Sequence, residues 1–212
     1  MKHLVLILGM HRSGTSTLTG ILNKMGLELG GNLMKATSAN PKGYFENMDF
    51  FVVNEQILRN CRSTWFNVNN VFNNNLLLNL QNKQILKNVF LKYSNYEIFG
   101  LKDPRICVLL PLYEHVCKEL GIKITYIYTE RNKDSVVKSI TKRDRLPANL
   151  VYDLIEKHKE RIHTKDFEVQ YEDLLSKPLE IIESLNKEFD FLNLKNKKDI
   201  LEFIDPKLNR NG

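Results

Sequence analysis

Short apolar runs alternate with segments of helical apolar spacing along this chain. The runs cover residues 3–8, 97–101, 124–129 and 167–171, and each predicts a strand. The first run is almost continuously apolar, which is typical of a strand buried on both faces of a parallel sheet. Apolar residues at helical spacing predict helices over residues 15–25, 50–60, 76–93, 108–120, 134–143 continuing into 148–161, and 179–189. Strands alternating with helices predict an α/β protein. We expect one domain over residues 1–212, a three-layer P-loop-type fold with a central parallel sheet flanked by helices.

One segment does not fit this alternation. Residues 67–75 read NVNNVFNNN, a composition that is polar and turn-prone. We therefore expect a mobile surface loop there, with no contribution to the core.

The loop after the first strand contains candidate anion-binding chemistry. It reads Gly9-Met-His-Arg-Ser-Gly-Thr-Ser16, which matches the phosphate-loop pattern GxxxxGK[ST] except that Thr15 replaces the lysine. Glycines allow backbone N–H groups to surround an anion, and the following helix directs its positive end to the same place. Arg12 adds a charge, and hydroxyl groups come from Ser13, Thr15, Ser16 and Thr17.

The missing lysine argues against ATP with magnesium, because nucleotide triphosphatases place that lysine on the β- and γ-phosphates. A tight strand-to-helix turn without a ligand is the simpler alternative.

Two further groups follow predicted strands, at the edge of the sheet where open α/β proteins bind ligands. Lys102, Asp103, Pro104 and Arg105 come after the second strand. Asp103 before a proline is typical of a helix N-cap.

After the third strand, Arg131 and Ser139 combine a cation with a hydroxyl, and the two could clamp one phosphate. The alternative is a solvated arginine and an exposed helical serine.

These motifs together resemble the sulfotransferases that use 3′-phosphoadenosine 5′-phosphosulfate (PAPS) as donor. The loop resembles their 5′-phosphosulfate loop. The ordered set resembles the bacterial branch of the family, and its other segments are Asn40-Pro-Lys-Gly-Tyr-Phe-Glu46, Lys102-Asp-Pro-Arg105, Arg131-Asn132…Ser139, Tyr171-Glu-Asp173 and Phe203-Ile-Asp-Pro-Lys207.

The resemblance implies a role for each matching residue. Residues 12–17, among them Arg12, would hold the 5′-phosphosulfate, while Arg131 and Ser139 would hold the 3′-phosphate. Lys102 would stabilise the leaving group. We interpret the Tyr171 segment as structural, with Asp173 capping the next helix, and residues 210–212 as a possible contact to the 3′-phosphate.

Transfer to a hydroxyl also requires a proton acceptor. Many animal relatives carry histidine at the position of Pro104, so this chain departs from their pattern. Relatives that use a carboxylate take it from the region after the first helix, where Glu46 is the best match. Weaker candidates are Asp103, His115 and His11. Arg105 would pair with the acceptor or with a carboxylate.

Composition limits the class of protein and its cellular compartment. The chain has 212 residues, of which 42% are hydrophobic and 26% charged, as in ordinary globular proteins, and no apolar run reaches the length of a membrane span. The N-terminal apolar run is too short for a signal peptide. Three cysteines without CxxC spacing argue against disulfides and a zinc site and predict a cytoplasmic protein.

The net charge of +6 suggests an anionic partner. Nucleic acid is not expected, because the basic residues do not interleave with aromatic ones.

The leading hypothesis is a PAPS-dependent sulfotransferase that acts on a small-molecule or glycan hydroxyl. Its catalytic residues would be Glu46, Lys102 and Arg12, and it would need no metal. The alternatives are a P-loop small-molecule kinase and a nucleotide-binding protein without turnover. The sequence does not indicate the oligomeric state.

Overall fold

The computed structural model describes residues 1–38 and 40–204. Its sheet has four strands, all parallel, in the order β2-β1-β3-β4. The strands are β1 (His3–Leu8), β2 (Ile98–Lys102), β3 (Lys123–Glu130) and β4 (Phe167–Gln170). In the register, Ile7 lies opposite Lys102 on one side and Ile127 on the other, so the carboxyl ends of these strands meet at one edge.

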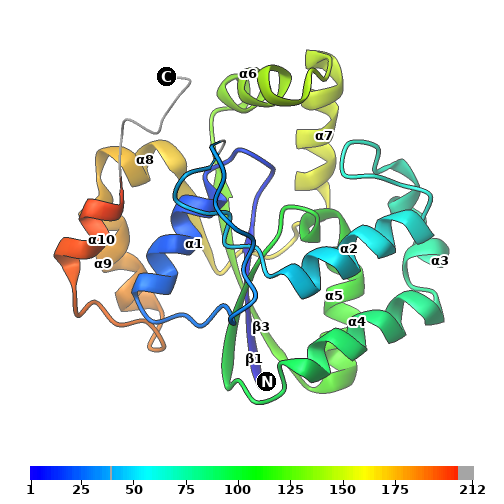
Figure 1. Cartoon of the computed structure of the whole chain (residues 1–212), viewed down its shortest axis with the longest axis horizontal. Helices are drawn as coiled ribbons and strands as arrows, with labels where there is room; N and C mark the ends of the chain where they lie inside the picture. Colours follow the sequence, from blue (N-terminus) through cyan, green and yellow to red (C-terminus); the bar gives the residue numbers. More distant parts are fainter. Residues whose placement is uncertain (39, 205–212) are drawn as a thin grey trace.

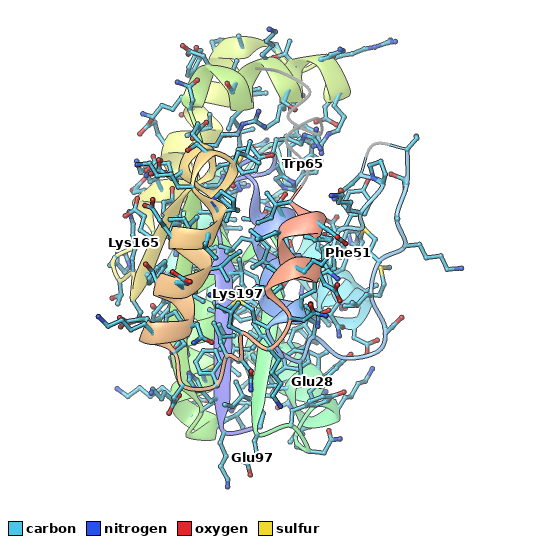
Figure 2. The ribbon with its side chains drawn as sticks, turned by 90° about the vertical axis from the view of Figure 1, so that its left-hand side faces the viewer. Glu28, Phe51, Trp65, Glu97, Lys165 and Lys197 are labelled. Carbon is cyan, nitrogen blue, oxygen red and sulfur yellow. The ribbon has the colours of Figure 1, made fainter. Side chains whose placement is uncertain are left out.

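Helices cover both faces of this sheet, which confirms the predicted fold class. On one face lie α1 (Thr15–Lys24), α8 (Tyr171–Ser176), α9 (Pro178–Glu188) and α10 (Lys197–Phe203), and in Figure 2 α9 and α10 lie in front of the strands. On the other side lie α2 (Met48–Asn60), η1 (Asn69–Phe72), α3 (Asn74–Leu77), α4 (Leu80–Lys92), α5 (Ile106–Leu120) and α7 (Ala148–Glu160). Helix α6 (Lys133–Asp144) lies above the carboxyl ends of the strands (Figure 1).

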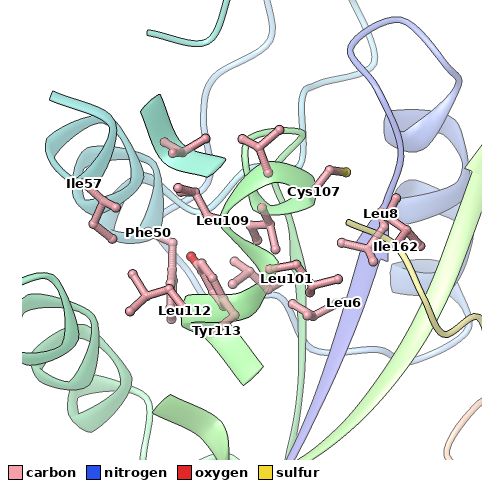
Figure 3. Close-up of a cluster of buried hydrophobic side chains, with 14 of the residues drawn as sticks. Leu6, Leu8, Phe50, Ile57, Leu101, Cys107, Leu109, Leu112, Tyr113 and Ile162 are labelled. Atoms are coloured by element: carbon pink, nitrogen blue, oxygen red, sulfur yellow. The ribbon is translucent and has the colours of Figure 1, made fainter. Parts of the chain in front are cut away.

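Alternation along β1 divides the core in two. Leu4, Leu6 and Leu8 belong to the larger hydrophobic cluster, whereas Val5 and Ile7 belong to the cluster under α1 and α9. Successive side chains of a strand point to opposite faces, so a continuously apolar strand is required between two helical layers. Figure 3 shows the larger cluster, in which α5 packs against the sheet and α2 packs on α5.

The asparagine-rich segment is not the loop that its composition predicts. It contains η1 and the first half of α3, and its Val68 and Val71 are buried in the larger cluster, as is Leu77 just after it. Asn73 acts as a helix cap: its side chain accepts the N–H of Asn75 and starts α3. The prediction of a loop without core residues was wrong, because isolated valines among polar residues show no periodicity.

Three element boundaries also differ from those predicted, two of them in helices and one at the end of a strand. The helix expected over 76–93 is interrupted by Asn79, whose side chain accepts the N–H of Asn82 and starts α4. The helices α6 and α7 are separate, because Arg145 adopts a left-handed conformation and Pro147 follows it.

Tyr171 begins α8 instead of ending a strand. Asp173 lies inside α8, and the next helix, α9, has Lys177 at its N-cap and no side-chain cap. The capping role predicted for Asp173 was therefore wrong.

Among the described residues, no helix combines the length and the apolar character that a membrane span requires. Cys61, Cys107 and Cys117 are buried free thiols. Burial raises the pKa of Cys107 and of Cys117 to about 12, so both thiols are protonated at neutral pH. The cytoplasmic location stays a prediction.

Candidate functional site

A cleft with a cavity volume of about 270 Å³ lies at the carboxyl ends of β1, β2 and β3. Its walls come from the loop after β1, from residues 40–46 (the strap), and from the residues that follow β2 and β3. Six cationic side chains line it against two carboxylates, so the cleft favours an anionic ligand.

The loop after β1 leaves the start of α1 open to a ligand. Gly14 has a φ of 92°, and a Cβ there would lie 2.1 Å from Tyr171 Cδ2, so only glycine fits. No side chain caps α1 and its first turn has no acidic residue. Within residues 1–38 and 40–204, the N–H groups of Gly14, Thr15 and Ser16 have no hydrogen-bond acceptor. Three such donors at a helix N-terminus have the geometry and the charge to bind an anion.

Arg12 of this loop and Arg131, which follows β3, lie close together. Arg12 Nε donates to Ser139 Oγ at 2.8 Å, and Arg131 Nη1 donates to the Arg12 carbonyl oxygen at 3.2 Å. The Arg131 guanidinium also lies 4.8 Å from the centre of the Tyr171 ring. The structure thus brings Arg12, Arg131 and Ser139 together, with the serine hydroxyl accepting a hydrogen bond from Arg12.

A buried ion pair connects the loop after β1 to the strap. Lys102 Nζ lies 2.7 Å from Glu46 Oε1, 3.3 Å from Ser16 Oγ and 3.4 Å from the Tyr44 carbonyl oxygen. Both charged residues are almost fully buried, at 3% and 6% exposure. The two side chains meet because of where they lie in the fold: Lys102 is the last residue of β2, and Glu46 lies just before α2. The two residues predicted as leaving-group cation and base are therefore adjacent.

Arg105 holds the other side of Glu46. Its Nη2 lies 3.0 Å from Glu46 Oε2, and it also pairs with Glu55 at 3.2 Å and with Asp103 at 2.9 Å. Burial opposes the charge of Arg105, but the three carboxylates outweigh burial and raise its pKa. Arg105 is therefore paired with carboxylates, one of the two partners expected for it.

Asp103 is fully occupied within the protein. It accepts the backbone N–H of Arg105 at 2.9 Å just before α5, and it accepts the amide of Asn54 at 2.9 Å. It is 1% exposed and is not among the residues that line the cleft. Helix α5 begins at Ile106 with Arg105 at its N-cap and no side-chain cap, so Asp103 binds the turn before the helix and does not cap the helix as predicted.

No family model matches this sequence, and no curated protein sequence matches it. A solved structure does: the sulfotransferase domain from the Synechococcus PCC 7002 olefin synthase, with a TM-score of 0.53 and 18% identity. The match covers 100% of this chain and 85% of that one. The chain has a sulfotransferase fold.

Some of the predicted donor-binding residues line the cleft and others do not. Arg12, Gly14, Thr15, Ser16, Thr17 and Arg131 line the cleft. Ser13 does not line it: its side chain is buried and donates to the Met10 carbonyl oxygen at 2.6 Å. Ser139 is not among the lining residues either, and it accepts a hydrogen bond from Arg12, which does line the cleft.

Of the two histidines considered as proton acceptors, one lies outside the cleft and the other lines it. His115 lies on α5 with Nε2 2.8 Å from Glu119, outside the cleft. His11 lines the cleft with its ring 4.8 Å from that of Trp65. Burial, followed by the charge of Arg105, lowers the pKa of His11 well below its usual value, so it is neutral. Residues 205–207 and 210–212 lie outside the described residues.

Four residues of the cleft wall were not singled out by sequence reasoning: Phe51, Trp65, Arg143 and Asp144. Lys42 also lines the cleft and belongs to the segment of residues 40–46 that the resemblance includes. A further signal was that Trp65 is the single tryptophan of the chain. Among the residues described, no three His, Cys, Asp or Glu side chains are grouped so that they could hold a metal ion.

Proposed function

We propose that this chain is a sulfotransferase that moves a sulfuryl group from PAPS to a hydroxyl of a small molecule or glycan. The observation that carries the proposal is the buried Lys102–Glu46 pair beside the open N-terminus of α1. The pair puts a cation and a proton acceptor next to an anion site.

Each group has a task in the transfer. The N–H groups of residues 14–16 and Arg12 bind the 5′-phosphosulfate, and Arg131 binds the 3′-phosphate. The acceptor oxygen attacks sulfur, and the bond from sulfur to the 5′-phosphate oxygen breaks. Lys102 stabilises the negative charge that this phosphate gains.

Glu46 takes the acceptor's proton, which leaves a sulfate ester and adenosine 3′,5′-bisphosphate. Each carboxylate oxygen of Glu46 accepts one N–H, from Lys102 or Arg105, and retains a second lone pair for that proton.

A P-loop kinase and a nucleotide-binding protein without turnover are the competing functions. Thr15 in place of the phosphate-loop lysine argues against the kinase. The Lys102–Glu46 pair argues against a protein that only binds a nucleotide. A carboxylate beside an anion site weakens anion binding, so a protein that only binds gains nothing from Glu46, whereas an enzyme uses it as proton acceptor.

A thermal-shift titration separates these functions. Adenosine 3′,5′-bisphosphate at one hundred times its dissociation constant should stabilise the fold by about 2.7 kcal/mol, or about 5–10 °C in Tm. Arg131→Ala should remove most of this shift. Arg59→Ala, an exposed arginine on α2 outside the cleft, should not. Stabilisation by ATP with magnesium alone would contradict the proposal.

A further inference from the structure

Helix α1 contains a glycine near its centre, and two aromatic rings pack against it. Gly20 is buried, and a Cβ there would lie 2.4 Å from Phe203 Cζ and 2.9 Å from Phe45 Cζ. Phe203 ends α10, which lies beside α1 in Figure 1, and Phe45 belongs to the strap. Glycine weakens a helix interior more than any residue except proline, and the close approach of the two rings is a physical reason for it here.

Phe203 also holds the strap at Lys42. The ring centres of Phe203 and Phe45 lie 6.0 Å apart with their planes at 76°, an edge-to-face arrangement. Lys42 Nζ lies 5.0 Å from the centre of the Phe203 ring and donates to the Phe203 carbonyl oxygen. Gly20, Lys42, Phe45 and Phe203 are here called the Phe203 clamp, because together they fasten the strap to α1 and α10.

The strap backbone is strained at Phe45. Its φ of 57° lies in the left-handed region, which is costly for a residue with a bulky side chain. Such a conformation persists only where the surroundings hold it, and the clamp holds the Phe45 ring. Glu46 is the next residue, so the backbone angles at Phe45 set the direction in which the Glu46 side chain leaves the strap.

Other elements hold the carboxylate of Glu46. Lys102 Nζ and Arg105 Nη2 lie 2.7 Å and 3.0 Å from its two oxygens. Lys102 ends β2 and Arg105 directly precedes α5, so neither cation belongs to the clamp. The cations attract the carboxylate, whereas the backbone position of Glu46 decides which of its lone pairs face the cleft.

We infer that Phe203 is a positioning residue, which acts on Glu46 through Phe45 and the strap. The inference rests on the proposed function, because the role of Glu46 as proton acceptor belongs to that function. Loss of the Phe203 ring lets Phe45 relax toward ordinary backbone angles, and Glu46 moves with it. Proton transfer needs the carboxylate within hydrogen-bond reach of the acceptor hydroxyl, and a misplacement of about 1 Å can slow an enzyme about 10²-fold.

The competing explanation is a direct contact between the Phe203 ring and a substrate, because Phe203 lines the cleft. Gly20 does not line it, so Gly20→Ala displaces the rings of Phe45 and Phe203 while every cleft-lining residue keeps its chemistry. The matched control is Phe191→Leu. Phe191 is also partly buried against the hydrophobic cluster under α1 and α9, but its ring stacks on Phe189 outside the cleft.

A double-mutant cycle tests the connection without any substrate. Urea unfolding is measured for the wild type, Phe203→Leu, Glu46→Gln and the double variant; leucine keeps an apolar side chain and so limits the loss of stability. If the clamp positions Glu46, Phe203→Leu has already weakened its ion pairs. Glu46→Gln should then change the unfolding equilibrium constant at least about fivefold less in that background than in the wild type. The same cycle with Phe191→Leu should be additive within about twofold.

The rate of transfer from PAPS tests the consequence for catalysis, with methyl glucoside as a sugar acceptor and benzyl alcohol as an aromatic one. We expect Phe203→Leu and Gly20→Ala each to lower kcat about 10- to 100-fold. The KM for PAPS should stay within about twofold of the wild-type value, because the clamp acts on Glu46 and not on the loop after β1. Phe191→Leu should match the wild type.

An additive cycle between Phe203→Leu and Glu46→Gln would overturn the inference. A loss of kcat in Phe203→Leu without a loss in Gly20→Ala would also overturn it, since the ring would then contact a substrate directly. Failure of the proposed function looks different: the bisphosphate would not stabilise the wild type and neither alcohol would be sulfated, yet the cycle would still show coupling. If the bisphosphate binds and neither alcohol is sulfated, the cycle alone decides the inference.

Discussion

Replacing Glu46 by glutamine tests the centre of the site for stability and chemistry together. The carboxylate lies between Lys102 and Arg105, which are 3% and 5% exposed, so the change leaves two buried cations with one fewer negative charge. Breaking a buried ion pair by removing one partner costs about 3–5 kcal/mol. We expect the lower end, about 3 kcal/mol, because glutamine keeps one oxygen as an acceptor and Arg105 keeps its pairs with Glu55 and Asp103.

The same change should remove the proton acceptor. We expect the release of adenosine 3′,5′-bisphosphate from PAPS, measured with a hydroxyl acceptor that the wild type sulfates, to slow by about 10²- to 10⁴-fold. Affinity for the bisphosphate should not fall, since the variant removes negative charge beside an anion site. Intact affinity with a lost rate would show that the variant is folded and catalytically impaired.

Glu55→Gln is the matched control. Glu55 pairs with the same arginine at 3.2 Å, but its side chain is 28% exposed and does not line the cleft. We expect a stability loss of about 1 kcal/mol or less and an unchanged rate. If Glu46→Gln turns over like the wild type, or loses no more stability than Glu55→Gln in urea unfolding, the assignment of Glu46 is refuted.

Three further changes test the fold around the site. Gly14→Ala should abolish the bisphosphate-induced thermal shift and destabilise the protein more than Gly26→Ala. Both glycines have positive φ, so an alanine at either position incurs about 1–2 kcal/mol of strain. Only a Cβ at Gly14 meets the Tyr171 ring, so equal melting temperatures of the two variants would contradict the close contact. Tyr113→Phe removes a buried hydroxyl that donates to an asparagine at 2.7 Å, and chemical denaturation should show a loss of about 1–3 kcal/mol. Burial lowers the pKa of His158 to about 4, so between pH 6.5 and 4 the unfolded chain binds a proton that the folded chain does not. Stability should therefore fall by about 3 kcal/mol as the pH drops through that window, and His158→Phe should make the unfolding free energy less dependent on pH.

The sequence was most informative where a pattern has one structural solution. The continuously apolar β1 requires a helical layer on each face of the sheet, and the two hydrophobic clusters supply these layers. It was least informative in the asparagine-rich segment. Val68 and Val71 are buried there because they pack into the larger hydrophobic cluster with residues of other helices, which no local spacing shows.

By itself, the sequence determined which chemical groups come at the end of each strand. These are glycines before α1, a lysine that ends β2 and an arginine that follows β3. Parallel strands bring such residues to one edge of the sheet, so their closeness follows from topology alone. Only the tertiary structure decided that Glu46 contacts Lys102, that Ser139 supports Arg12 and that Trp65 forms a wall of the cleft. These contacts join segments far apart in the chain, and their geometry depends on how the strap, α2 and α6 pack against the sheet and not on the spacing within any one segment.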